Sequence, residues 1–111
     1  MCPAQLGQLL TPHYDEVKAF DGEILALSHE TVANNQALTD KHGVPFPMLS
    51  DTARQSIRDY DTADPLLGIA KIAFFLVDQD GIIRWKSTDH SNVDPNDLPE
   101  WEAIQQAFEE L

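Results

Sequence analysis

The chemistry in this sequence centres on its single cysteine, Cys2, which lies directly before Pro3 and a segment of helical pattern. Backbone N–H groups are unpaired in the first turn of a helix, and the helix dipole is positive there. Both effects favour the thiolate, which is the nucleophilic form of cysteine. Pro3 suits the first helical position, because its missing N–H costs no hydrogen bond there. The pattern therefore indicates a reactive thiol at the start of a helix.

The other polar residues carry weaker signals. The four histidines, His13, His29, His42 and His90, lack the spacing of metal ligands, and the acids at 78 and 80 belong to a turn, so we expect no metal site. No glycine-rich phosphate loop is present, and no cofactor is expected. Arg84 lies where it could pair with a nearby acid, which indicates a structural role.

Composition limits the classes of partner. The 111 residues include 19 acidic and 7 basic side chains, giving a net charge of −12. Nucleic acids and anionic membranes both need a basic surface, so neither is expected as a partner. One cysteine excludes an internal disulfide and favours a reducing compartment. With no signal-peptide pattern and no long apolar run, we expect a cytoplasmic protein. The acidic surface fits adaptation to high salt, which we favour slightly, or an ordinary acidic cytosolic protein.

Hydrophobic spacing predicts the elements that would position these residues. A helical pattern covers residues 6–20, and Pro12 should either kink it or follow Thr11 as the cap of a second segment. A buried strand is predicted at residues 24–28, a helix at 31–42, an extended connector at 44–49 and a second helix at 51–60. Two antiparallel strands follow at 72–77 and 82–86, then a polar loop at 87–96 and a closing helix at 98–111. The order α-β-α-α-β-β-α predicts one α/β domain over residues 1–111, with a partly parallel sheet.

The predicted helices have specific inner faces. Ser28 or Thr31 should cap the helix over 31–42, and Gly43 should end it. Ser50 or Asp51 should cap the next helix. The inward residues of that helix and of the closing helix are expected to be Ala53, Ile57, Tyr60, Trp101, Ile104, Phe108 and Leu111.

Four segments of the chain resemble the peroxiredoxins, in the broad alkyl hydroperoxide reductase and thiol-specific antioxidant group. CPAQL at residues 2–6 resembles the stretch that begins at that family's peroxide-reacting cysteine. EILALS at 23–28 is similar to the core strand that follows it. KHGVPFPMLSD at 41–51 is the most specific match, and AFFLVDQDGIIR at 73–84 resembles a later strand and turn. The resemblance implies a thioredoxin-like sheet flanked by helices.

The resemblance also implies an activity. Cys2 would reduce hydroperoxides, and an external thiol would regenerate it. Lys71 stands near the position of an assisting arginine, and could act as a catalytic cation or be a surface lysine flanking a strand. Lysine keeps the charge but lacks the planar fork of arginine. Ahead of the cysteine the family has strands and a Pro-x-x-x-Thr/Ser-x-x-Cys loop, where this sequence has Met1 alone.

These departures leave alternatives open. Without the N-terminal strands, the strands at 24–28 and 72–77 must pair directly, or another segment must fill the gap between them. A second copy of the chain could supply that strand in a swapped homodimer. The alternative function is a non-catalytic thioredoxin-like domain, structural or partner-binding, that remains from a truncated redoxin. A third possibility is that the natural start lies upstream of Met1.

Overall fold

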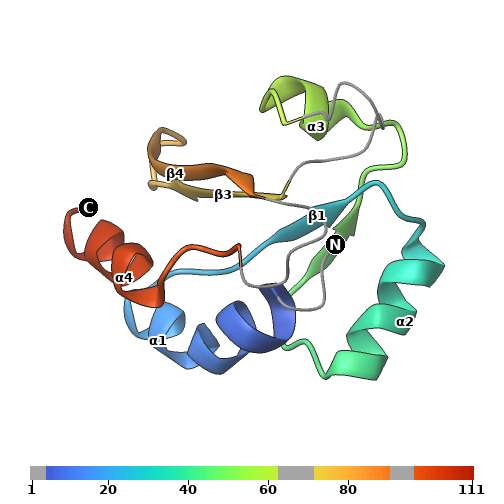
Figure 1. The fold of residues 1–111 in the computed structure, drawn as a ribbon, viewed down its shortest axis with the longest axis horizontal. Coiled ribbons are helices and arrows are strands. Elements are labelled where there is room, and N and C mark those ends of the chain that lie inside the picture. Colours follow the sequence, from blue (N-terminus) through green and yellow to red (C-terminus); the bar gives the residue numbers. More distant parts are fainter. Residues whose placement is uncertain (1–4, 63–71, 91–96) are drawn as a thin grey trace.

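The computed structural model describes residues 5–62, 72–90 and 97–111, and its strands lie between helices (Figure 1). The α/β arrangement predicted from the sequence is confirmed. The described residues contain one strand more than the sequence predicted. Their four strands are β1 (Ala26–Ser28), β2 (Met48–Ser50), β3 (Ile72–Val77) and β4 (Ile83–His90).

The strands form two separate pairs. β1 and β2 are parallel, and Leu27 lies opposite Leu49. β3 and β4 are antiparallel, with Phe75 opposite Lys86. Among the described residues, no backbone pairing joins β1 to β3. The sequence left open whether these two strands pair directly or another segment fills the gap between them. In the described part of the chain they do not pair directly.

The N-terminal helical segment is divided at Pro12, as its sequence predicts. It consists of a π-helix η1 (Gln5–Leu10), a 3-10 turn η2 (Thr11–His13) and the helix α1 (Tyr14–Ala19). The alternative that Thr11 caps the second segment is wrong. Its hydroxyl makes no cap hydrogen bond and finds no partner among the described residues.

Helix α2 (Val32–His42) begins and ends where the sequence predicts. The hydroxyl of Thr31 accepts a hydrogen bond from the backbone N–H of Asn34 at 3.2 Å. Gly43 ends the helix with φ of 62°, in the left-handed region that glycine adopts without a steric penalty. The residues that follow were expected to form only an extended connector. They include β2, because its backbone pairs in parallel with β1 after the α2 crossover.

Helix α3 (Gln55–Asp59) is shorter than predicted, and the side chain of Asp51 accepts hydrogen bonds from the N–H groups of its first two residues. Ile57 is buried as expected. Ala53 and Tyr60 were predicted to face inward, but Ala53 precedes the helix and Tyr60 is 44% exposed. A helix of little more than one turn can bury only a narrow face.

β4 extends through His90, so residues 87–90 form strand where a polar loop was expected. Backbone pairing with β3 stabilises this polar stretch. The sequence did not predict it as strand, because it lacks the alternation of apolar and polar residues that is typical of strands. The closing helix α4 (Trp101–Glu109) starts later than predicted. Its Trp101 and Ile104 are buried as expected, while Leu111 lies beyond the helix and is 57% exposed.

Two hydrophobic clusters hold the helices to the strands. The first joins β1 to the segment before β2 and contains Ala26, Val44 and Phe46. The second joins the N-terminal helices to α4 and contains Leu9, Val17, Trp101 and Ile104. Aromatic stacking extends the second cluster, with Phe20 on Phe108 at 5.1 Å between ring centroids. No helix in the described ranges is long and apolar enough to cross a bilayer.

Candidate functional site

The two residues that the sequence predicts for catalysis, Cys2 and Lys71, lie outside the described residues. The structure does describe the elements that follow them in the chain. η1 begins at Gln5, and β3 begins at Ile72, which pairs with His90 at the end of β4. Ile72 directly follows Lys71 in the sequence, so the pair of Ile72 with His90 is where the structure resumes after Lys71.

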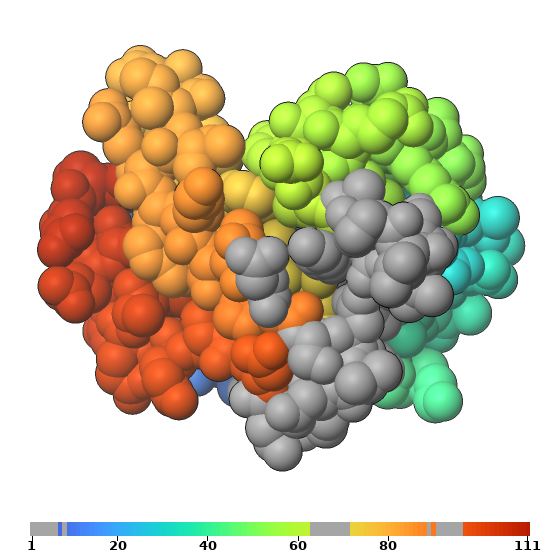
Figure 2. Space-filling model, turned by 45° about the horizontal axis from the view of Figure 1, so that its top comes forward, coloured from blue at the N-terminus to red at the C-terminus, as the bar shows by residue number. Residues whose placement is uncertain are grey.

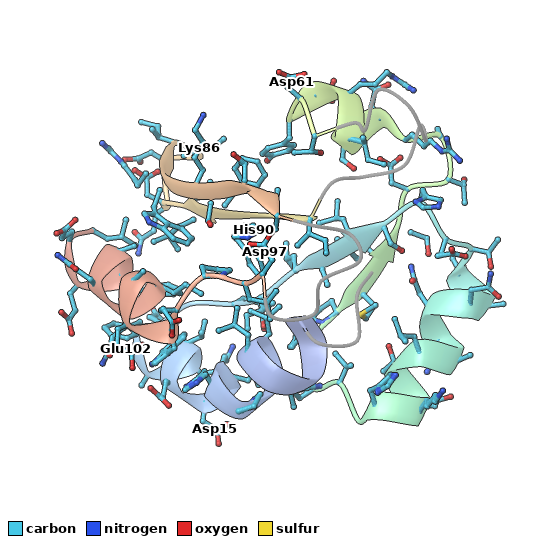
Figure 3. All side chains as sticks on the ribbon, viewed as in Figure 1. Asp15, Asp61, Lys86, His90, Asp97 and Glu102 are labelled. Carbon is cyan, nitrogen blue, oxygen red and sulfur yellow. The ribbon has the colours of Figure 1, made fainter. Side chains whose placement is uncertain are left out.

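His90 bonds to one side chain through each of its ring nitrogens. Nε2 lies 2.6 Å from the hydroxyl oxygen of Ser87, and Nδ1 lies 3.0 Å from Oδ1 of Asp97. The ring is only 11% exposed and contacts Phe74 edge-on. Figure 3 shows His90 and Asp97 facing one another between β4 and the segment that leads into α4. A carboxylate at one nitrogen fixes the ring orientation, and the other nitrogen can exchange a proton with the hydroxyl.

A β-bulge creates this arrangement. Ile72 and Phe74 are two residues apart on β3, while their partners His90 and Ser87 are three apart on β4. Residues three apart in a regular strand would point to opposite faces. The extra residue in β4 turns both side chains to the same side, as bulges often do beside functional sites. Sequence reasoning missed this cluster, because a Ser-x-x-His spacing within a polar stretch gives no sign of a bulge.

The chain of hydrogen bonds from Ser87 to Asp97 has the order of a serine–histidine–acid relay. None of its three residues lines the apolar cavity that β1, β3, α3 and α4 enclose, which is described below. The hydrogen bonds of these three residues connect the end of β4 to the segment before α4 and hold the two segments together.

Two other carboxylates are held in their ionised form. Asp78 accepts hydrogen bonds from the N–H groups of Ile82 and Asp80, and Arg84 donates to it at 2.6 Å. The Ile82 N–H bond, then the Arg84 bond, lower the pKa of Asp78. The predicted pairing of Arg84 with a nearby acid is thus confirmed. Gly81 completes the turn with φ of 82°.

Glu23 is the second of these carboxylates, and it lies just before β1. It accepts hydrogen bonds from the N–H of Ile24 at 2.8 Å, from the hydroxyl of Tyr14 at 3.1 Å and from Lys18 at 3.3 Å. The Ile24 N–H contributes most to lowering the pKa of Glu23, and the bond to Glu23 in turn raises the pKa of Tyr14. This cluster ties α1 to the entrance of β1.

A cavity of about 530 Å³ lies between the two strand pairs. Its walls come from β1, β3, α3 and α4, and the surface is hollowed between the β3–β4 hairpin and α3 (Figure 2). Aromatic and aliphatic side chains dominate the lining, among them Leu27, Phe75, Trp85 and Trp101. Among the described residues, no group of three or more histidine, cysteine or acidic side chains could hold a metal ion.

Comparison with known proteins assigns the family. The model of the AhpC/TSA family matches residues 1–86, which include both Cys2 and Lys71. Alkyl hydroperoxide reductase C of Buchnera aphidicola is 34% identical over 106 residues, covering 89% of this chain and 50% of that protein. The selenocysteine-containing peroxiredoxin PrxU of Peptoclostridium acidaminophilum is 33% identical over 78 residues, covering 64% of this chain and 38% of that protein. The chain belongs to the AhpC/TSA family of peroxiredoxin-type, thioredoxin-like redoxins.

Solved structures agree on the fold. AhpC of Enterococcus faecalis superposes with a TM-score of 0.84 at 23% identity, covering 98% of this chain and 65% of that one. The mitochondrial 2-Cys peroxiredoxin of Plasmodium falciparum gives 0.83 at 16% identity, covering 99% of this chain and 66% of that one. The chain spans about half or less of the length of the curated relatives described above. It therefore corresponds to part of the peroxiredoxin domain.

Proposed function

We propose that this protein is a thiol peroxidase that reduces hydroperoxides through Cys2. The observation that carries the proposal is the family match over residues 1–86, a region that includes Cys2. The sequence Cys2-Pro3, followed by a helix described from Gln5, supports a thiolate at a helix start.

The reaction balances with an external thiol. The Cys2 thiolate attacks one peroxide oxygen, the O–O bond breaks, and the leaving oxygen takes a proton and departs as water or an alcohol. Cys2 is then a sulfenic acid. A first reductant thiol displaces water to give a mixed disulfide, and a second thiol releases the Cys2 thiol and a reductant disulfide. The 111 residues contain no second cysteine that could resolve the sulfenic acid, so we assign this step to an external thiol.

Lys71 is the proposed electrostatic assistant. A cation beside the sulfur would favour the thiolate and stabilise the negative charge that develops on the leaving oxygen.

We further propose that residues 1–111 form one domain, that the protein acts in the cytoplasm, and that it forms a homodimer through strand exchange. The single cysteine supports the compartment, and the edges of β1 and β3 that have no partner strand among the described residues support the dimer.

Trapping of the intermediate tests this function. One equivalent of hydrogen peroxide, followed by dimedone, should add one dimedone to the peptide that contains Cys2, as seen by mass spectrometry. Iodoacetamide alkylation followed against pH should give a thiol pKa at least one unit below about 8.5, the value for a free cysteine. No dimedone adduct together with an ordinary thiol pKa would contradict a peroxidatic role.

The alternative is a non-catalytic domain that binds a partner. The cavity between β1 and β3 favours it, because an apolar space beside strand edges that are unpaired in the described part of the chain suits a binding role. Lysine in place of the family's arginine also favours it. An ordinary thiol pKa would support this alternative.

A further inference from the structure

Ser87, His90 and Asp97 are bonded in the order that activates a serine hydroxyl. The carboxylate of Asp97 can only accept a hydrogen bond, so the proton of the neutral His90 ring lies on Nδ1, 3.0 Å from Asp97 Oδ1. This tautomer leaves Nε2 as an acceptor, and the hydroxyl of Ser87 donates to it at 2.6 Å. The imidazole is therefore oriented to take the hydroxyl proton as the Ser87 oxygen attacks an electrophile.

The surroundings of His90 hold its ring in this position. Phe74 contacts the ring edge-on, with 5.7 Å between the ring centroids. Phe74 is also the partner of Ser87 in the β3–β4 register, so one aromatic side chain borders both residues. The side chain of His90 is 11% exposed, and this low exposure to water strengthens its two hydrogen bonds. Ser87 itself is only partly buried, as a nucleophile that meets its substrate from solvent must be.

The other serine hydroxyls in the described part of the chain have different partners. The hydroxyl of Ser56 donates to the carboxylate of Asp51, and the hydroxyl of Ser28 donates to the side-chain oxygen of Asn35. Neither arrangement contains an imidazole that could accept the proton and then return it. Among the described serines, the hydrogen bonds thus give Ser87 alone a base that is itself oriented by a carboxylate.

We propose that Ser87 is a second nucleophile of this protein, activated by His90 and Asp97, and that it takes acyl groups from small esters without negative charge. A small acyl group fits because none of the three residues lines the apolar cavity that could hold a long one. The net charge of −12 disfavours anionic esters. This activity does not depend on thiol chemistry at Cys2.

The reaction proceeds by transfer of the acyl group to Ser87 and then to water. The Ser87 oxygen bonds to the carbonyl carbon of the ester while Nε2 of His90 takes the hydroxyl proton. The bond from that carbon to the leaving oxygen breaks, and the proton on Nε2 passes to the leaving group, which departs as an alcohol. Water then attacks the acyl-serine in the same way, which releases a carboxylic acid and restores the hydroxyl. Asp97 keeps the ring oriented in both steps.

A fluorophosphonate probe tests the nucleophile directly, because an activated serine bonds to its phosphorus as fluoride leaves. Mass spectrometry of peptides locates the adduct in the native chain. We expect one adduct, on Ser87, that forms about a hundredfold faster than any on Ser56. Ser56 is the matched internal control, since it is also partly buried and bonds to a carboxylate without an imidazole between. Unfolding in urea should abolish the preference for Ser87.

Variants separate the activated serine from a structural link. Asp97→Asn should slow labelling of Ser87 by at least about tenfold, because an amide can donate to Nδ1 and so favour the wrong tautomer of His90. His90→Gln should slow it by about a hundredfold, since no base remains. Hydrolysis of p-nitrophenyl acetate tests the substrate class, and it is measured in Cys2→Ser because a thiol also attacks this ester. Cys2→Ser should hydrolyse it about tenfold faster than Cys2→Ser combined with Ser87→Ala.

Three outcomes would overturn the proposal. Equal labelling of Ser87 and Ser56, or equal labelling of Ser87 in the folded and unfolded chain, would show that Ser87 is an ordinary serine. Undiminished labelling of folded Asp97→Asn would reduce the three residues to a structural link. Equal ester hydrolysis with and without Ser87 would remove the acyl-transfer activity. Where circular dichroism shows that a variant at His90 or Asp97 does not fold, the comparison of Ser87 with Ser56 in the native chain decides.

Discussion

The amide of Asn35 on α2 donates a hydrogen bond to the hydroxyl of Ser50 on β2 at 2.8 Å. The same amide nitrogen reaches the carbonyl of Leu49, and the side-chain oxygen accepts from Ser28 on β1. Asn35 is only 2% exposed. A single buried amide thus joins the helix to both strands of the parallel pair.

Asn35→Ala should therefore destabilise the protein by about 2–4 kcal/mol, given three hydrogen bonds of about 1 kcal/mol each and the buried partners left unpaired. Urea denaturation followed by circular dichroism measures the free energy of unfolding. Asn34→Ala is the control, because Asn34 is exposed on the same helix, and its effect should stay within about 0.5 kcal/mol. Equal effects at the two positions would contradict the bridging role of Asn35.

Asp78→Asn should lower the melting temperature by a few degrees at pH 7. The folded state lowers the pKa of Asp78 from 3.8, so its stabilisation is complete above about pH 4 and is lost as the pH falls further. The difference between native and variant should therefore shrink in calorimetry below pH 4. Arg84→Gln should have a smaller effect, because the Ile82 N–H is the larger cause of the shift. A difference that grows toward low pH would contradict this assignment.

The sequence predicted the helices, the β3–β4 hairpin and the family, because these depend on local patterns. Thr31 and Gly43 mark the ends of α2 through side-chain capping and the left-handed conformation. β2 escaped prediction because its three residues are stabilised by pairing with β1, and its prolines favoured a connector. The strand at residues 24–28 was predicted to be buried, but Leu25 and Leu27 are exposed. A run of consecutive apolar residues is typical of a strand that has a paired strand at each edge. In the described part of the chain, β1 has a paired strand at one edge only.

The candidate site was only partly predictable. Cys2 and Lys71 follow from the helix-start pattern and the family resemblance, and both stay predictions because they fall outside the described residues. The His90 cluster depends on a one-residue bulge and on Asp97, seven residues away. Neither leaves a local signal in the sequence.

Added salt should stabilise the protein. With a net charge of −12, the folded state experiences self-repulsion that ions screen, and the Debye length falls to about 3 Å at 1 M. We expect the melting temperature to rise by about 4–8 °C between 0.05 and 2 M KCl, corresponding to about 1 kcal/mol. Differential scanning fluorimetry measures this shift. A constant or falling melting temperature would contradict salt adaptation.

Lys71→Met should slow the reaction of Cys2 with hydrogen peroxide by about tenfold, equivalent to about 1.4 kcal/mol in the barrier. Lys71→Arg should retain or increase the rate, because the guanidinium adds a planar fork to the charge. Lys86→Met is the control, since Lys86 is an exposed lysine on β4 and its loss changes the net charge by the same amount. Stopped-flow competition kinetics measure the rates. Similar losses in Lys71→Met and Lys86→Met would assign the effect to net charge alone.

Steady-state consumption of hydrogen peroxide with dithiothreitol is the most direct test of the proposed function. The native chain should consume peroxide with multiple turnovers, and Cys2→Ser should fall to the rate of buffer with dithiothreitol alone. Circular dichroism should confirm that the variant is folded. Equal rates for the native chain and Cys2→Ser would contradict peroxidase activity at Cys2.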